Sequence, residues 1–306
     1  MRYIISGYIG FDNFGDEAIA ASLVQKLKNQ DVEKITLISS NPSKTAKLYE
    51  VDSCGMLKFF KPLINSDILI SGGGSLLQDA TSLKSLIYYL AVIYSALIFG
   101  KKVEIFAQGI GPIKSKIGQI LTKFALKNAD KITVRDIHSQ ELLKSWGIEA
   151  ELVLDPLLTI DLPHKNRIGT IGIQLRNFKG VTEDFLIKLA KEIKNRFFDK
   201  KIEIFSLQDS VDLELCKRFA EILRQDGISN IELLSGLDVN EVINRISDLE
   251  YLIGMRFHSN VIGIKAGVKT LAINYDPKVK ALAEQYNLPL INLNDEDFSK
   301  EFGKLN

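Results

Sequence analysis

The stretch YIISGYIGFDNFGDEAIAASLVQKLKN, residues 3–29, decides the fold class. A short run of β-branched and aromatic residues, typical of a buried strand, leads through a glycine-containing loop into an amphipathic segment over 16–29. The same order recurs along the chain. Similar apolar runs lie at 35–39, 68–71, 103–107, 132–135, 152–154, 168–175, 202–207, 231–234, 251–253 and 270–274, and amphipathic segments at 117–128, 140–146 and 183–198. Runs that do not alternate predict parallel strands covered on both faces, as in doubly wound α/β units.

The length of 306 residues suits two domains. Periodicity is lost over 155–167, which carries Pro156 and Pro163, and a new strand follows. We therefore predict two Rossmann-like doubly wound domains, 1–162 and 163–306. We expect them to face each other across a cleft into which the carboxyl ends of both sheets point, since ligands of open α/β sheets bind there.

Composition excludes several classes of protein. The chain is 46% hydrophobic and 25% charged with a net charge of +1, which offers no overall attraction to nucleic acid or to anionic membranes and leaves room only for a local basic site. The N-terminal apolar run is too short for a signal peptide, and the longest uncharged apolar stretch, 85–100, is too short for a membrane span. Cys54 and Cys216 suit free thiols in a reducing compartment. We expect a cytoplasmic protein. The segment 83–99 is apolar nearly all round, which favours a buried helix, with an oligomer or membrane-surface contact as the alternative.

Three glycine-rich loops follow predicted strands of the first domain, at 7–15, 71–75 and 108–112. Their spacing matches neither the dinucleotide fingerprint nor the phosphate loop with its lysine. Loops in register at one sheet edge indicate a ligand-binding edge. In the first loop, Asp16 is placed to cap or begin the helix, and Asp16 and Glu17 suit either a functional site or the helix dipole.

Charged side chains follow other strands. Arg135 ends the strand 132–134, where its planar guanidinium could bind phosphate or carboxylate, or form a structural ion pair with Asp136 or Asp155. The segment Arg256-Phe257-His258 follows the strand 251–253, with a helix expected at 261–266, and Lys278 follows the next strand. Arg and Lys together suit a small dianion, and histidine titrates closest to neutrality. His138 and His164 lack such neighbours and are predicted to be surface or linker residues.

In these motifs the chain resembles the polysaccharide pyruvyl transferase family, especially members that add ketal pyruvate to bacterial cell-wall polysaccharides. The resemblance covers nearly the whole chain. It is carried by 7–10, 13–17, 72–79, 108–112, 134–136, 155–156 and 256–258. Phe257 departs from the leucine that is common between the arginine and the histidine of the last motif. The resemblance implies a fold like that of GT-B glycosyltransferases, phosphoenolpyruvate as donor and a sugar, often lipid-linked, as acceptor.

The resemblance also implies the site. Donor binding falls to Arg135, Arg256, Phe257, His258 and Lys278 in this numbering, mostly in the second domain. We assign the acceptor by position to the first domain, at Asp12, Asn13, Asp16, Glu17, Gly73, Gly74 and Gln108. We expect His258 to act as the acid and Asp16 or Glu17 to accept a hydroxyl proton. No cofactor and no metal is expected, since no metal-ligand cluster is visible. A homo-oligomer and a transient membrane-surface contact stay open.

Two rival functions stay open as well. A nucleotide-sugar glycosyltransferase of the same architecture would use Arg256 and Lys278 as pyrophosphate ligands. A non-catalytic sugar-phosphate binding protein would bind the donor without releasing phosphate. The glycine spacing disfavours a third reading, a nicotinamide-dependent dehydrogenase.

Overall fold

A computed structural model describes residues 1–80, 82–162 and 169–305 of the chain. The chain divides into two compact units, Met1–Ile160 and Asp161–Asn306, each of which is described by itself. This division falls two residues before the predicted boundary. Pro163 and His164, both part of the predicted linker, lie outside the described residues.

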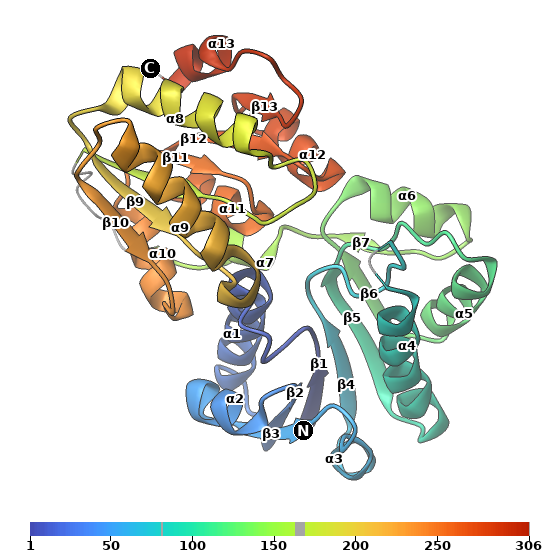
Figure 1. Cartoon of the computed structure of the whole chain (residues 1–306). Coiled ribbons are helices and arrows are strands. Elements are labelled where there is room, and N and C mark those ends of the chain that lie inside the picture. The colour runs from blue at the N-terminus through green and yellow to red at the C-terminus, as the bar shows by residue number, and fades with distance from the viewer. Residues whose placement is uncertain (81, 163–168, 306) are drawn as a thin grey trace. The chain divides into compact units, whose positions relative to one another are not determined.

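The first unit is built on a seven-stranded, wholly parallel sheet in the order β3-β2-β1-β4-β5-β6-β7. Its elements are β1 (Arg2–Ser6), α1 (Phe14–Lys28), β2 (Lys34–Ser39), α2 (Pro42–Tyr49), β3 (Asp52–Gly55), α3 (Phe60–Ile64), β4 (Ile68–Gly72), α4 (Leu83–Ile98), β5 (Lys102–Gln108), α5 (Lys116–Lys127), β6 (Lys131–Val134), α6 (Ile137–Ser145), β7 (Glu151–Leu152) and α7 (Pro156–Thr159). The chain thus runs outward from β1 to one edge and then, from β4, to the other (Figure 1).

Two hydrophobic clusters cover the faces of this sheet. One joins α1 and α2 to β1, β2 and β4, with Leu23 and Tyr49 among its buried members. The other joins α3, α4, α5 and α6 to the sheet through residues such as Leu63, Ile93 and Leu126. Strands covered on both faces explain why their sequences read as continuous apolar runs.

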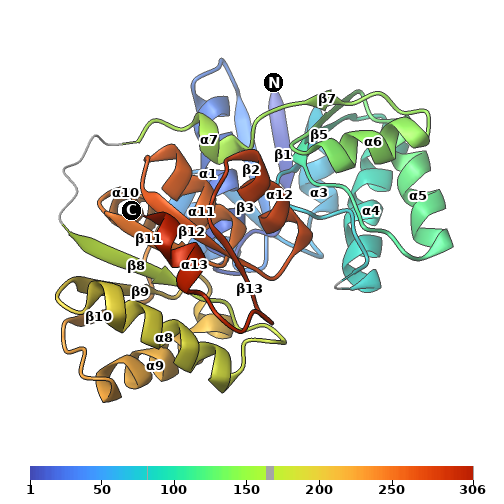
Figure 2. The same ribbon diagram turned by 90° about the horizontal axis from the view of Figure 1, so that it is seen from above.

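The second unit repeats the plan with a six-stranded parallel sheet in the order β10-β9-β8-β11-β12-β13 (Figure 2). Its elements are β8 (Thr170–Gln174), α8 (Glu183–Phe197), β9 (Lys201–Phe205), α9 (Asp209–Gln225), β10 (Ile231–Leu234), α10 (Val239–Ser247), β11 (Tyr251–Gly254), α11 (Phe257–Lys265), β12 (Lys269–Asn274), α12 (Pro277–Gln285), β13 (Leu290–Asn292), α13 (Ser299–Phe302) and the 3-10 helix η1 (Gly303–Leu305).

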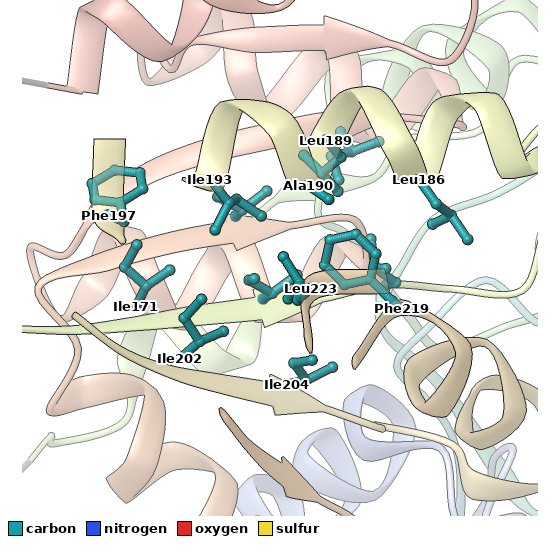
Figure 3. Close-up of a cluster of buried hydrophobic side chains, with 14 of the residues drawn as sticks. Ile171, Leu186, Leu189, Ala190, Ile193, Phe197, Ile202, Ile204, Phe219 and Leu223 are labelled. Atoms are coloured by element: carbon teal, nitrogen blue, oxygen red, sulfur yellow. The ribbon is translucent and has the colours of Figure 1, made fainter. Parts of the chain in front are cut away.

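The main core of the second unit lies between its sheet and helices α8 and α9. Ile193 and Phe197 of α8 point toward Ile171 and Ile202 of the sheet, and Phe219 of α9 closes the layer (Figure 3). Burial of each such side chain stabilises the fold by about 1.5–3 kcal/mol. This core holds the central strands, whose carboxyl ends carry the candidate site.

The fold class of two Rossmann-like, doubly wound α/β units is confirmed. The predicted helix over 83–99 is α4, Leu83–Ile98. Several element boundaries differ from the prediction, among them the start of α6, which was expected at residue 140 and lies at Ile137 because Asp136 caps the helix. Helix α11 begins at Phe257, four residues before the predicted start, and α1 begins at Phe14 with Asn13 as its N-cap, so Asp16 lies within the first turn. In the described part of the chain, no helix combines the length and the apolar character that crossing a membrane requires.

Candidate functional site

Each sheet reverses its strand order at one point, between β1 and β4 in the first unit and between β8 and β11 in the second. The loops at the carboxyl ends of such strands diverge and leave room for a ligand. Buried polar atoms gather at these ends. Among the described residues, nine buried side-chain atoms lack a hydrogen-bond partner. Six of them belong to residues that end a strand (Ser6, Gln108), follow one within two residues (Arg176, Ser206) or lie in the first turn of the next helix (Asp209, Asn260). Buried polar atoms are normally paired, so this clustering indicates where a ligand or water would bind.

Glu17 organises the first loop of the first unit. Its carboxylate is buried and accepts hydrogen bonds from the Gly10 amide at 2.7 Å and from the Tyr49 hydroxyl at 2.5 Å. Burial raises the pKa of the Glu17 carboxyl, while the bonds from Tyr49 and Gly10 oppose that rise. Both carboxylate oxygens are thus bonded within the protein. Glu17 holds the loop in shape, and of the two predicted bases Asp16 is the more accessible one.

Asp16 lies against the second glycine loop. Its Oδ2 accepts a hydrogen bond from the Asn13 side-chain amide at 2.7 Å. A Cβ added to Gly74 would lie 2.5 Å from Asp16 Oδ1, and one added to Gly73 would overlap Ile19 of α1. Both glycines have positive φ. Glycine is required at both positions because the loop turns sharply while it packs against α1. Asp12 lies apart from this contact, paired with Lys44 at 2.7 Å on the surface.

Gln108 ends β5 and is fully buried. Its amide nitrogen donates to the carbonyl oxygen and the hydroxyl of Ser71, at 2.9 and 2.8 Å, while its Oε1 lacks a partner in the described part of the chain. Ser71 is the register neighbour of Ser6, whose hydroxyl also lacks a partner there. The ends of β1 and β5, on either side of β4, therefore each present an unsatisfied polar atom near the predicted acceptor residues.

Arg135 follows β6 and forms a buried ion pair. Its Nη1 lies 2.7 Å from Asp155 Oδ2, with both side chains about one-twentieth exposed. Its Nη2 donates to the Ser75 hydroxyl at 3.3 Å, and Asp155 caps α7 through the Leu157 amide. Of the two readings left open for Arg135, the ion pair with Asp155 is present. Donor binding by Arg135 stays a prediction.

Arg256 is the centre of a buried network in the second unit. Its Nε donates to Asp212 Oδ2 at 2.7 Å and its Nη2 to Gln208 at 2.9 Å, while its amide donates to Gln174 at 2.6 Å. Asp212 is fully buried, and its other oxygen accepts from the Asn177 amide. The Arg256 guanidinium is thereby held at the junction of β8, β9 and β11, and it orients the start of α11.

His258 lies in the first turn of α11, directly after this arginine. The histidine is half-buried, and its ring meets the Phe257 ring edge-on with centroids 5.1 Å apart. Because α11 starts at Phe257, His258 lies where backbone amides and the helix dipole favour an anion. His138, by contrast, is exposed on α6, as predicted, and His164 lies outside the described residues.

Two cations lie at the neighbouring strand ends. Lys278 is half-buried in the first turn of α12, after β12, and forms no ion pair among the described residues. Arg176, which we had not predicted, follows β8. Its Nη1 donates to the Tyr275 hydroxyl at 2.9 Å, and its guanidinium lies 5.1 Å from the centre of the Tyr275 ring. The adjacent strands β8, β11 and β12 therefore bring Arg176, His258 and Lys278 to one edge. The sequence signal for Arg176 was its place right after an apolar run.

Comparison with known proteins now identifies the chain. The family model described as "Polysaccharide pyruvyl transferase" matches residues 13–277. The chain belongs to the polysaccharide pyruvyl transferase family. The chain is 23% identical over 304 residues to the amylovoran biosynthesis protein AmsJ of Erwinia amylovora. This alignment covers 88% of the chain and 71% of AmsJ.

Solved structures show the same fold. The S. aureus MnaA–UDP structure matches the pyruvyl transferase family member with a TM-score of 0.68 at 11% identity, covering 100% of this chain and 88% of that one. The UDP-GlcNAc 2-epimerase of Methanocaldococcus jannaschii matches with a TM-score of 0.66 at 10% identity, covering 100% and 91%. These likenesses confirm the predicted GT-B-like architecture.

Proposed function

We propose that this protein transfers pyruvate from phosphoenolpyruvate to two hydroxyls of a hexose in a cell-wall or exopolysaccharide precursor. Membership of the family supports the transferase activity, and likeness to an amylovoran biosynthesis protein supports a polysaccharide precursor as acceptor. The observation that carries the choice of donor is the gathering of Arg176, His258 and Lys278 at the strand-order reversal of the second unit. A compact set of cations and a helix N-terminus suits a small molecule that bears both phosphate and carboxylate.

In this proposal the donor groups divide the work. Lys278 and Arg176 supply positive charge to the phosphate and carboxylate, and the amides of Phe257 and His258 donate from the start of α11. Arg256 binds the donor through guanidinium N–H groups outside its contacts with Asp212 and Gln208, and the family resemblance assigns Arg135 to the donor as well. Each buried pair also fixes its guanidinium in place, so little side-chain entropy is lost when the donor binds.

The chemistry proceeds in two additions. His258 protonates the methylene carbon of phosphoenolpyruvate, and the first sugar hydroxyl adds to the neighbouring carbon and gives its proton to Asp16. The bond from that carbon to the phosphate oxygen then breaks, and the second hydroxyl takes its place. Its proton leaves with phosphate, and the product is a cyclic ketal. A positioned acid or base of this kind contributes about 10²–10⁴-fold to rate.

The acceptor is assigned to the first unit. Asp16, Asn13 and the Gly73-Gly74 turn form one contact surface, and Gln108 lies at the next strand end with an unsatisfied oxygen. Sugar hydroxyls both donate and accept, so they match this mixture of carboxylate, amide and backbone groups. We extend the assignment to a lipid-linked sugar, which the family resemblance implies.

A binding experiment separates this proposal from a nucleotide-sugar glycosyltransferase. Thermal shift is measured with phosphoenolpyruvate and with a panel of UDP-sugars, for the wild type, for Lys278→Ala and for Lys280→Ala. Lys280 lies on the same helix but is exposed and pairs with Glu284, so it is a matched control. We expect phosphoenolpyruvate to raise the unfolding temperature, and Lys278→Ala alone to reduce that rise. Stabilisation by UDP-sugars and not by phosphoenolpyruvate would reject the proposed donor.

A further inference from the structure

Helices α4 and α5 of the first unit leave an apolar face exposed. They pack side by side (Figures 1 and 2). Tyr94 of α4 stacks on Phe124 of α5 with 5.9 Å between the ring centres. Large apolar side chains on both helices remain open to solvent, namely Leu83 and Ile87 on α4, 46% and 49% exposed, and Ile117, Ile120 and Phe124 on α5, 71%, 66% and 58% exposed. We call these five residues the α4–α5 face.

The α4–α5 face is continuous and hollowed. Its members recur at i, i+4 on α4 and at i, i+3, i+7 on α5, so each set forms one stripe along its helix. Between the first turns of the two helices runs a groove of about 350 Å³, lined by residues that include Leu86, Leu90 and Leu121. Single exposed apolar residues are ordinary, but a contiguous set on two packed helices indicates an interaction surface.

The charge on these two helices is one-sided. Helix α4, helix α5 and the loop residues 112–115 before α5 hold five lysines and no acidic residue, while Asp79 lies beside them with its carboxylate bonded to the Lys114 and Ser115 amides. The lysines are Lys84, Lys114, Lys116, Lys123 and Lys127. In the part of the chain that the structure describes, the ion pairs formed by lysine do not include these five. Their charge is thus not neutralised by the protein itself.

We propose that the α4–α5 face docks on an anionic lipid bilayer. Its apolar side chains would lie at the boundary of headgroups and acyl chains, and Lys116 and Lys123, each next to a member of the face in sequence, would contact lipid phosphates. Buried apolar area and attraction of lysines to anionic lipid are the two terms that hold interfacial helices on membranes. A second copy of this chain fits the face less well, because a two-fold contact would bring two lysine-rich surfaces together.

The position of the α4–α5 face in the first unit connects the docking to the proposed acceptor site. α4 and α5 begin at the carboxyl ends of β4 and β5, where the Gly73-Gly74 turn and Gln108 lie. Asp79 ties the two loops together by accepting from the Lys114 and Ser115 amides at 2.7 and 2.8 Å. The groove is lined by the first turns of α4 and α5 and therefore lies on the side of the first unit where its strands end. We infer that docking would bring a sugar on a membrane lipid toward Asp16, and this inference rests on the proposed function. The docking on the bilayer does not depend on that function.

Vesicle flotation tests the docking without donor or acceptor. Vesicles of phosphatidylcholine with phosphatidylglycerol are compared with vesicles of phosphatidylcholine alone. Two double variants are used, Ile117→Glu with Phe124→Glu and Lys116→Gln with Lys123→Gln. The control is Ile187→Glu with Phe198→Glu, since both residues lie at α8 of the second unit and are 51% and 57% exposed. All of these positions are exposed or partly exposed, and circular dichroism verifies that each variant is folded.

We expect the wild type and the control to float with the anionic vesicles and binding to weaken as salt is raised. Each double variant should lower the partition coefficient by about tenfold or more. Equal binding to neutral vesicles, or an equal loss in the control, would overturn the proposal. The proposal would also be overturned if the wild type did not bind vesicles and light scattering showed a dimer that the double variant Ile117→Glu with Phe124→Glu dissociates. If the wild type binds the anionic vesicles but catalyses no pyruvyl transfer, only the proposed function is rejected.

Discussion

The substitution Asp212→Ala removes the buried partner of Arg256. In the wild type, Asp212 is fully buried and its two oxygens accept from Arg256 Nε at 2.7 Å and from the Asn177 amide at 3.1 Å. After the substitution, the Asn177 amide can turn to water because Asn177 is exposed. Arg256 cannot do so, because its side chain is 8% exposed.

The main cost is therefore an uncompensated buried guanidinium. Removal of one partner of a buried ion pair costs about 3–5 kcal/mol of the free energy of unfolding. At about 2–4 °C per kcal/mol for a unit of this size, the unfolding temperature should fall by roughly 10 °C. The double variant Asp212→Leu with Arg256→Leu should recover most of that loss, since it leaves neither charge buried.

Thermal unfolding followed by circular dichroism measures both effects. The control is Asp184→Ala, which breaks a surface pair with Lys188 in which the aspartate is 74% exposed and should change stability by less than about 0.5 kcal/mol. The reasoning is refuted if Asp212→Ala unfolds within about 2 °C of Asp184→Ala. It is also refuted if the double variant is as unstable as the sum of its single variants, because the two residues would then not be coupled.

Three further predictions follow from single residues. His258→Ala should lower the rate of phosphate release by about 10²–10⁴-fold while His138→Ala, on exposed α6, leaves it unchanged, and a rate near wild type in His258→Ala would remove the acid from the mechanism. Burial raises the pKa of the Glu17 carboxyl in the folded state. Just above the ordinary glutamate pKa, the folded state therefore binds more protons than the unfolded state, and the contribution of Glu17 to stability falls as pH rises through that range. Urea unfolding is measured from about pH 4 to about pH 8, and the free energy of unfolding of Glu17→Gln should rise relative to that of the wild type as pH increases. An equal pH dependence of stability in the two proteins would contradict this. Burial raises the pKa of Cys216 to about 12 and that of Cys54 to about 11. A thiol reagent should therefore label Cys54 slowly and Cys216 only when the protein unfolds. Fast labelling of Cys216 in the folded protein would place that residue outside the core.

Most strands could be predicted because they are buried on both faces and therefore apolar throughout. β3 and β13 could not. β3 has the sequence DSCG, is partly exposed and lies at the edge of its sheet, so it lacks the apolar run that marks a central strand. β13 is a three-residue edge strand. The early start of α11 was missed because Arg256 is an uncommon N-cap residue whose side chain makes no capping bond.

The positions of the candidate residues at strand ends could be predicted, but most of their contacts could not. Glycine loops and charged residues that follow strands lie at one edge of each sheet because all strands of that sheet are parallel. Asp155 was one of the two partners predicted for Arg135, whereas the pairing of Arg256 with Asp212 depends on a contact across 44 residues, which local pattern does not encode. Glu17 and Asp16 are neighbours in sequence, yet one is buried against Tyr49 and the other lies at the Gly74 turn. Arg176 was missed because a single arginine after a strand has no distinctive spacing.

Phosphate release from phosphoenolpyruvate, measured across a panel of hexosides, tests the central claim most directly. We expect the wild-type protein to release phosphate only when an acceptor with two suitably placed hydroxyls is present, and mass spectrometry to find pyruvate attached to that acceptor as a ketal. Binding of phosphoenolpyruvate without phosphate release on any hexoside or lipid-linked precursor would instead indicate a sugar-phosphate binding protein. Consumption of a UDP-sugar with no use of phosphoenolpyruvate would contradict the account outright.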